Sequence, residues 1–299
     1  MPNLAAAPTP RTTRLLGVVA LALALLAGLA ATAPRAEAAG RQKVVAISPF
    51  AAATMVRFGV KPVAIGQTIG GLKRLPQALR NTRVLTLSHP NGPNLEVMAK
   101  MKPDVVFTSS RWSKGTPALE RLGIKVVDAD PLNVNQVYGS VAKIGRVLKR
   151  SNRTNAVNRA IRGQIRKATN FSGSRPKVLV VLGVGTTAMA FLKNSWGGQI
   201  IKLAGGNLVD GGASKPGGFV RLSDEIVVAE NPDRIVVVPH GSTDDMSQVV
   251  EFIKNNEAWQ TTNAVKNGKV FVSVDNELLQ SGPDVGAVIR SVRRDFITG

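Results

Sequence analysis

The sequence predicts an α/β protein of two lobes, each a mainly parallel sheet with flanking helices, joined by a long, rigid α-helix. First, short apolar strands alternate with helices of roughly ten residues, which is typical of parallel sheets. Second, residues 94–107 and 223–237 repeat one pattern, which indicates two similar lobes. Third, residues 133–170 show helical spacing without a strand pattern, and a helical link is stiffer than a Gly/Ser linker.

Each element rests on a local pattern. In the first lobe, apolar and β-branched runs predict strands at 43–48, 63–66, 83–87, 105–108 and 125–128. Two helices should follow, with inward stripes of Val137, Val141, Ile144, Val147 and Leu148 in the first and Val157, Ile161 and Ile165 in the second. The other face of the second helix carries Arg159, Arg162, Arg166 and Lys167 and no acid. In the second lobe we expect strands near 178–182, 207–209, 234–238 and 270–274, and helices near 196–204, 224–229, 244–254 and 284–296.

The amino-terminal segment has the features of a secretory signal. Arg11 and Arg14 precede an apolar run over residues 15–33, and Ala36-Glu37-Ala38 provides an A-x-A cleavage pattern. An uncleaved membrane anchor is the alternative. These patterns divide the chain into a signal peptide at 1–38, an N-terminal lobe at 39–148, a linking helix at 149–172 and a C-terminal lobe at 173–299.

Composition limits the class of protein. The chain of 299 residues has no cysteine, which excludes disulfides, thiolate metal sites, a cysteine nucleophile and a lipid-modified cysteine. Its net charge is +20, and +18 remains without the signal segment. We therefore expect an exported monomer at the periplasm or the outer face of the envelope, not lipid-anchored, with an anionic wall or membrane surface as an alternative partner. Nucleic acid is not expected, since stacking aromatics and a recognition helix are missing from the pattern.

The repeated unit places one glutamate in the first turn of a short helix in each lobe. These residues are Glu96 and Glu225, each followed by a Pro-Asp turn and an apolar strand. A carboxylate at this position also suits the helix dipole, so local physics alone accounts for it. The functional alternative is that both lobes present a carboxylate to one partner.

Few motifs point to catalysis. Gly183 to Ala188 matches the G-x-G-x-x-A form of a dinucleotide fingerprint, and the alternative is a tight turn facing a ligand. The two histidines, His89 and His240, follow predicted strands, where open α/β sheets place ligand loops. They are either hydrogen-bonded loop residues or, brought together, ligands of an iron centre. Aromatic and cationic residues at strand ends suit a planar anionic ligand. The expected ligand-binding residues are Phe50, His89, Arg111, Trp112, Gly185, Trp196, Arg221 and His240.

Several segments resemble the helix-linked (class III) periplasmic substrate-binding proteins of bacterial ABC importers for ferric siderophores, haem and vitamin B12. They are residues 44–49, 58–66, 94–106, 119–127, 203–207, 223–225, 231–233 and 259–271. The resemblance implies ligand capture between two lobes, and docking of Glu96 and Glu225 on the membrane permease. Ala52-Ala53 departs from the family, which often has Thr-Glu there.

The expected function is that of the solute-binding subunit of an ABC importer, not an enzyme. The expected small-molecule ligand is a ferric siderophore, with haem or a corrinoid as the alternative, and no intrinsic cofactor. No metal site is expected, except His89 and His240 if the ligand is haem. Less favoured readings are an exported α/β enzyme that uses the turn at 183–188 and a basic wall-binding protein.

Overall fold

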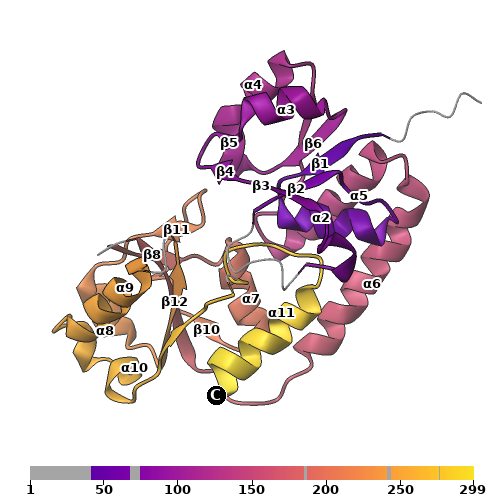
Figure 1. The fold of residues 1–299 in the computed structure, drawn as a ribbon. Helices are drawn as coiled ribbons and strands as arrows, with labels where there is room; N and C mark the ends of the chain where they lie inside the picture. Colours follow the sequence, from indigo (N-terminus) through magenta and orange to yellow (C-terminus); the bar gives the residue numbers. More distant parts are fainter. Residues whose placement is uncertain (1–41, 68–74, 185–186, 241–243, 276) are drawn as a thin grey trace, which may run out of the picture. The chain divides into compact units, whose positions relative to one another are not determined.

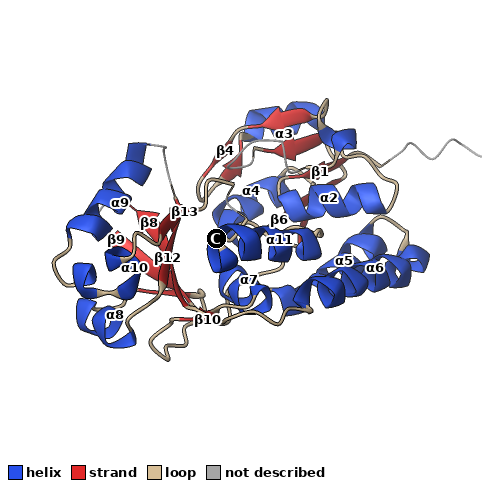
Figure 2. Cartoon of the chain, turned by 90° about the horizontal axis from the view of Figure 1, so that it is seen from below, coloured by secondary structure: helices blue, strands red, loops and turns tan. Residues whose placement is uncertain are grey.

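The computed structural model describes residues 42–67, 75–184, 187–240, 244–275 and 277–299. The predicted signal segment and Gly185 lie outside these residues. Lys43–Gly299 form one unit, whose described residues contain two large sheets flanked by helices and a two-stranded sheet of β4 (Leu87–Ser88) and β5 (Gly92–Pro93) (Figures 1 and 2). The predicted fold class of two lobes, each with a mainly parallel sheet and flanking helices, is confirmed.

The first sheet is fully parallel and has the strand order β3-β2-β1-β6-β7. Its strands are β1 (Val44–Ala46), β2 (Ala64–Gly66), β3 (Arg83–Leu85), β6 (Val105–Thr108) and β7 (Lys125–Asp128). The central strands are buried on both faces, because helices cover both. One face packs against α2 (Pro49–Arg57) and α5 (Val137–Val147), and the other against α3 (Leu95–Met101) and α4 (Thr116–Arg121).

The second sheet is mixed and has the order β11-β9-β8-β12-β13, with β10 pairing on β8. The strands are β8 (Lys177–Val184), β9 (Thr187–Phe191), β10 (Asn207–Leu208), β11 (Phe219–Val220), β12 (Arg234–Pro239) and β13 (Val270–Val272). One face packs against α7 (Trp196–Ala204) and α11 (Val285–Val292). The other face packs against α8 (Asp224–Glu230), α9 (Asp244–Asn255) and α10 (Asn263–Lys266).

The segment after β8 corrects one sequence interpretation. A dinucleotide fingerprint requires a helix to begin after the glycines, with the phosphates at its amino terminus. Instead, β9 runs antiparallel to β8, with Val184 opposite Thr187 and Leu182 opposite Met189. The described residues from Thr187 onwards thus form a strand where the fingerprint needs a helix, so the dinucleotide interpretation of residues 183–188 is wrong. The sequence missed β9 because its first residues complete the glycine motif.

A layer of helices connects the two sheets. The helix α6 (Ser151–Thr169), within the range 149–172 of the expected linker, buries Val157, Ile161 and Ala168 in a core shared by both lobes. It contacts α5, α7 and α11. A Cβ added at Gly286 of α11 would lie 2.6 Å from the Gln164 backbone oxygen, so the glycine permits the close approach of α11 to α6. The link is therefore part of a packed layer rather than a single free helix.

Candidate functional site

The two histidines and Trp112 come together from both lobes. His89 lies in the loop between β4 (Leu87–Ser88) and β5 (Gly92–Pro93), Trp112 lies in the 3₁₀ helix Ser110–Gly115 after β6, and His240 follows β12. The ring centroids of His89 and His240 are 6.5 Å apart, and those of His89 and Trp112 are 5.6 Å apart, both edge to face. With Arg111 these residues form what we call the histidine cluster. The fold thus joins the only two imidazoles of the chain, 151 positions apart in sequence.

Close packing of two loops holds Trp112 beside His89. A Cβ at Gly115 would lie only 1.7 Å from the Asn91 backbone oxygen, so only glycine permits this contact. The Asn91 amide also donates to the Ser88 oxygen at 2.7 Å, which closes the turn that carries His89. The β4–β5 hairpin and the 3₁₀ helix therefore form one support for the two rings.

Arg111 connects the histidine cluster to the segment that precedes α11. Its Nη2 donates to the Leu279 backbone oxygen at 2.7 Å. Burial lowers the pKa of Arg111, and the Asp130 carboxylate acts in the opposite direction. A guanidinium keeps its charge in proteins even so. It thus supplies a half-buried positive charge beside the imidazoles.

Asp130 accepts hydrogen bonds from two serines that are far apart in the sequence. Ser48 Oγ donates to Asp130 Oδ1 at 2.6 Å, and Ser281 Oγ donates to the same oxygen at 2.9 Å. Ser48 is also the N-cap of α2. Burial raises the pKa of Asp130, while these hydrogen bonds and the positive charge of Arg111 oppose the rise. Sequence reasoning missed this residue, although Asp130 lies two positions after the predicted strand at 125–128, and this position could have indicated it.

The electrostatic environment of His240 favours its neutral form. Partial burial lowers its pKa, and nearby His89 and Arg111 add to the effect because each disfavours a second positive charge. The His240 amide donates to the Gly183 oxygen at 3.1 Å, which anchors the loop to the end of β8. A neutral imidazole keeps a lone pair for a metal. His240 is therefore able to serve as an iron ligand near neutral pH.

Two expected pocket residues lie in the core instead. Phe50 is 0% exposed and Trp196 is 3% exposed, and both belong to the large apolar cluster between sheets and helices. The indole Nε1 of Trp196 donates to the Glu277 backbone oxygen at 2.9 Å. In this conformation neither ring lines a ligand pocket. Phe50 and Trp196 each lie at the start of a helix, α2 and α7, on the side that packs against the core. The sequence had indicated loops that face a ligand at these positions.

Arg221 lies at a different place from the histidines. It is exposed and lines a hollow of about 470 Å³ that is also lined by Glu225 and Trp259. No contact in the described part of the chain joins Arg221 to the histidine cluster. The sequence did not predict the location of Arg221. This residue follows β11, which pairs with β9, and neither strand was expected from the sequence.

The two glutamates occupy matching positions. Glu96 lies in the first turn of α3, capped by Asn94, and Glu225 in the first turn of α8, capped by Ser223. Both side chains are exposed. Hydrogen bonding by the Ser223 hydroxyl lowers the pKa of Glu225. Both carboxylates are thus presented to solvent on short, well-capped helices.

The match between the lobes extends past the helices. Each helix ends at a residue with positive φ, Lys102 at 46° and Asn231 at 44°. Asp104 Oδ2 then accepts from the Lys43 amide at 2.6 Å, and Asp233 Oδ2 accepts from the Lys177 amide at 2.8 Å. The repeat read from the sequence is therefore a structural repeat, with equivalent hydrogen bonds.

The described residues provide few metal ligands. They contain no group of three or more His, Cys, Asp or Glu side chains able to hold a metal ion. Two imidazoles alone suit a metal that arrives with other ligands already bound. Among the same residues, no helix is both long and apolar enough to cross a membrane.

Comparison with known proteins gives a consistent picture. A family model described as periplasmic binding protein matches residues 44–276. The high-affinity haem uptake system protein IsdE of Staphylococcus aureus is 26% identical over 204 residues, which cover 67% of this chain and 68% of that protein.

Solved structures show the same fold. The structure of S. aureus IsdE complexed with haem has a TM-score of 0.72 and 22% identity, covering 86% of this chain and 99% of that one. An ABC transporter substrate-binding protein of Listeria monocytogenes has a TM-score of 0.74 and 20% identity, covering 87% and 100%. The periplasmic haem-binding protein HutB of Vibrio cholerae has a TM-score of 0.66 and 16% identity, covering 85% and 98%. The predicted resemblance is confirmed.

Proposed function

Because the chain belongs to the periplasmic binding protein family, we propose that it is the solute-binding subunit of an ABC importer and captures an iron complex between its two lobes. The histidine cluster is the observation that carries the proposal, since it draws one imidazole from each lobe. The matched relatives are named as a haem uptake system protein and an ABC transporter substrate-binding protein, in agreement with the expected class.

The spacing of His89 and His240 supports haem as a second candidate ligand beside the ferric siderophore, which the sequence had put first. A siderophore brings its iron fully coordinated and needs only charge and shape from the protein. Haem has open axial positions, for which carriers supply side-chain ligands. Imidazole nitrogens bind first-row metals at about 2 Å, so two rings on opposite sides of one ion have centroids about 6 Å apart. The observed 6.5 Å is comparable. The name of the matched haem uptake system protein supports the same candidate.

Arg111 and Trp112 add what a planar anionic ligand requires. Arg111 offers a half-buried guanidinium, and Trp112 a partly exposed ring at the same place. The guanidinium is a strong donor to carboxylates such as those of haem. A corrinoid, the remaining candidate, has no comparable feature in its favour here.

Absorbance spectroscopy of the protein with added haemin tests the proposal. The unmodified protein should give a Soret band typical of an imidazole-ligated haem. His89→Ala and His240→Ala should each shift this band and weaken binding, and added imidazole should restore the spectrum by occupying the vacant position. Arg80→Ala, an exposed residue of the first lobe, is the control and should leave the spectrum unchanged.

A ferric siderophore predicts the opposite result. In that case both histidine variants bind the iron complex as the unmodified protein does, and haemin gives no defined spectrum. Absence of binding to any iron complex would contradict the general proposal.

A further inference from the structure

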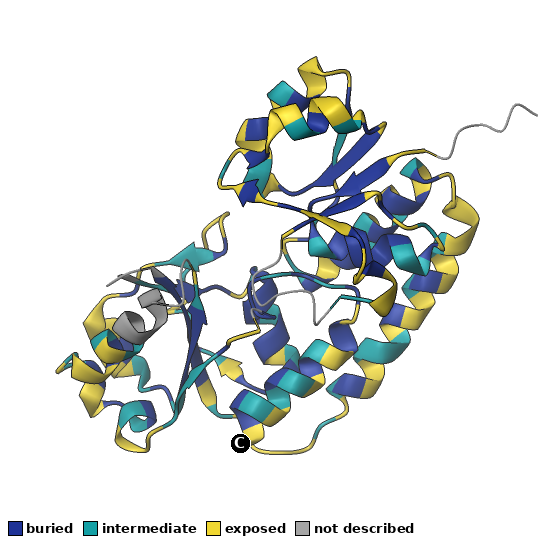
Figure 3. Ribbon diagram, viewed as in Figure 1, coloured by how far each residue is buried: buried dark blue, intermediate teal, exposed yellow. Residues whose placement is uncertain are grey.

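The exposed side of α6 carries positive charge only. No Asp or Glu lies between Asp130 and Asp210, and this stretch contains thirteen Lys and Arg residues. One side of α6 is buried against the core and the other is exposed (Figure 3). Arg159, Arg162 and Arg166 are all exposed. The proposed iron site uses none of these cations. They form what we call the basic face.

Neighbouring elements leave this charge uncompensated. The helices α5 and α7, which contact α6, contain no acid. The helical segment that starts with α11 brings Asp284 and Asp295 to this part of the molecule, but these carboxylates pair with Arg57 at 2.6 Å and Arg294 at 2.7 Å. The basic face is therefore not balanced by the acids packed beside it.

The arginines themselves are not occupied by internal ion pairs. Within the described ranges, no carboxylate pairs with Arg159, Arg162 or Arg166. The Arg162 guanidinium carbon lies 4.7 Å from the centroid of the Tyr138 ring, which is a cation–π contact and not an ion pair. Guanidinium donors match phosphate oxygens in geometry and charge.

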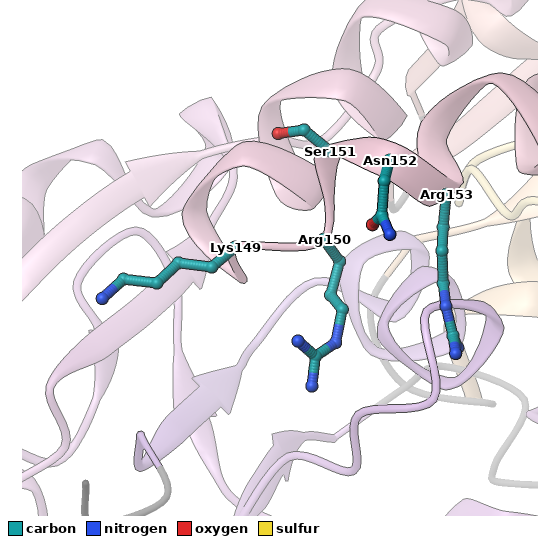
Figure 4. A pocket seen from close by; sticks show the side chains of 5 residues that line it. All are labelled: Lys149, Arg150, Ser151, Asn152 and Arg153. Atoms are coloured by element: carbon teal, nitrogen blue, oxygen red, sulfur yellow. The ribbon is translucent and has the colours of Figure 1, made fainter.

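Hollows lined by cations extend the basic face at both ends of α6. At its start, a hollow of about 450 Å³ is lined by Lys149, Arg150 and Arg153 with two polar neighbours (Figure 4). Arg150 and Arg153 point to the same side there, and Arg153 also donates to the Phe58 oxygen at 3.3 Å. Beyond the end of α6, a hollow of about 320 Å³ is lined by Arg175, Lys193 and Lys202, together with Asp210.

The extent of this face indicates the shape of its partner. The nineteen residues of α6 span about 28 Å at 1.5 Å per residue. A single small anion would contact one hollow only, whereas a linear polymer could contact the whole length. The large apolar residues that are exposed in the described ranges all lie outside residues 137–209, so the face lacks the apolar anchors of a membrane-inserting surface.

We propose that the basic face binds a linear polymer of the cell envelope whose charges are phosphates. This contact would keep the protein near the cell surface by electrostatic attraction. The polymer site lies on α6 and its flanking hollows, apart from the histidine cluster. The inference is thus independent of which iron complex is bound.

Binding of the protein to long-chain polyphosphate, measured by fluorescence anisotropy over a range of salt concentrations, tests this inference. The triple variant Arg159→Gln, Arg162→Gln, Arg166→Gln should bind about tenfold more weakly and with a shallower salt dependence, because fewer counterions are released. The matched control, Lys61→Gln, Arg80→Gln, Arg121→Gln, loses the same net charge at exposed positions of the first lobe and should stay within about twofold.

Two further probes identify the partner. Orthophosphate should bind far more weakly than the polymer, and vesicles of phosphatidylglycerol should not retain the protein as the polymer does. If both triple variants lose the same amount of affinity for polyphosphate, binding depends on net charge and not on the basic face, and the proposal is overturned. Stronger retention by vesicles, or equal affinity for orthophosphate, would overturn it as well. Thermal unfolding and ligand spectra of each variant separate these outcomes from misfolding.

Discussion

Ser281 Oγ donates a hydrogen bond to Asp130 Oδ1 at 2.9 Å, across 151 positions of the sequence. Asp130 follows the last strand of the first sheet, and Ser281 lies in the segment that leads into α11. The same oxygen also accepts from Ser48, the cap of α2. One carboxylate oxygen thus fixes three segments directly beside Arg111, whose guanidinium holds the Leu279 oxygen.

Replacing Asp130 by Asn should change how stability depends on pH. Because the pKa of Asp130 is raised in the folded state, the folded protein holds its proton more tightly than the unfolded chain. Stability therefore falls as pH rises from the ordinary Asp pKa near ~3.9 through the folded value. The variant Asp130→Asn lacks this titrating group, so its stability does not decrease in this way. The difference between its free energy of unfolding and that of the unmodified protein should therefore increase with pH. Urea denaturation at several pH values measures this difference.

Asp130→Ala serves as the contrasting variant. It leaves the hydroxyls of Ser48 and Ser281 without an acceptor, at a cost of about 1–3 kcal/mol for each unsatisfied group. It should destabilise the protein at every pH. A constant difference between Asp130→Asn and the unmodified protein would contradict the role given to burial.

Arg111→Gln should move the pH dependence of haem binding. Protonation of His240 removes its lone pair, so affinity should fall as pH drops through its pKa. Burial, His89 and Arg111 all lower that pKa below the ordinary value near ~6.5. Without the positive charge of Arg111 the pKa should rise, and the loss of affinity should begin at higher pH. Haem titration by absorbance across pH measures the midpoint.

Arg221→Gln provides the control for this experiment, since Arg221 is exposed and lines the hollow with Glu225. Its midpoint should match that of the unmodified protein. An unchanged midpoint in Arg111→Gln would show that Arg111 does not act on His240.

The double variant Glu96→Ala, Glu225→Ala should separate transport from ligand binding. Both carboxylates are exposed and lie in equivalent first turns, so we propose that they dock on the permease. Uptake with the membrane transporter should be abolished, while ligand affinity stays within about threefold, or ~0.6 kcal/mol. The exposed pair Glu120→Ala, Glu257→Ala is the control and should support normal uptake. A large loss of affinity in the isolated double variant would count against docking.

Gly286→Ala should destabilise the protein although it changes the surface little. The added Cβ would lie 2.6 Å from the Gln164 backbone oxygen and force α11 away from α6. Overpacking of this kind costs about 1–3 kcal/mol. Gly139→Ala, at a helical glycine with no atom within 4 Å of the added Cβ, should be neutral or stabilising. Thermal unfolding of both variants checks the difference, and equal melting temperatures would contradict the tight α6–α11 contact.

The sequence determined the features that depend on neighbouring residues. Periodicity and capping predicted β6, β7 and α7 at their observed bounds. The repeated caps and Pro-Asp turns correctly placed Glu96 and Glu225 in equivalent turns. Such patterns are legible because hydrogen bonds within a turn or a helix link residues only a few positions apart.

Only the tertiary structure decided which of the distant residues meet. The distance between His89 and His240, and the bonds of Ser48 and Ser281 to Asp130, depend on the packing of segments about 80 to 150 positions apart. Packing also buried Phe50. The face of a helix that is buried depends on the sheet against which it packs as well as on the helix's own sequence. Local sequence fixes the direction of each element, but burial of apolar surface against distant partners fixes which side chains remain at the site.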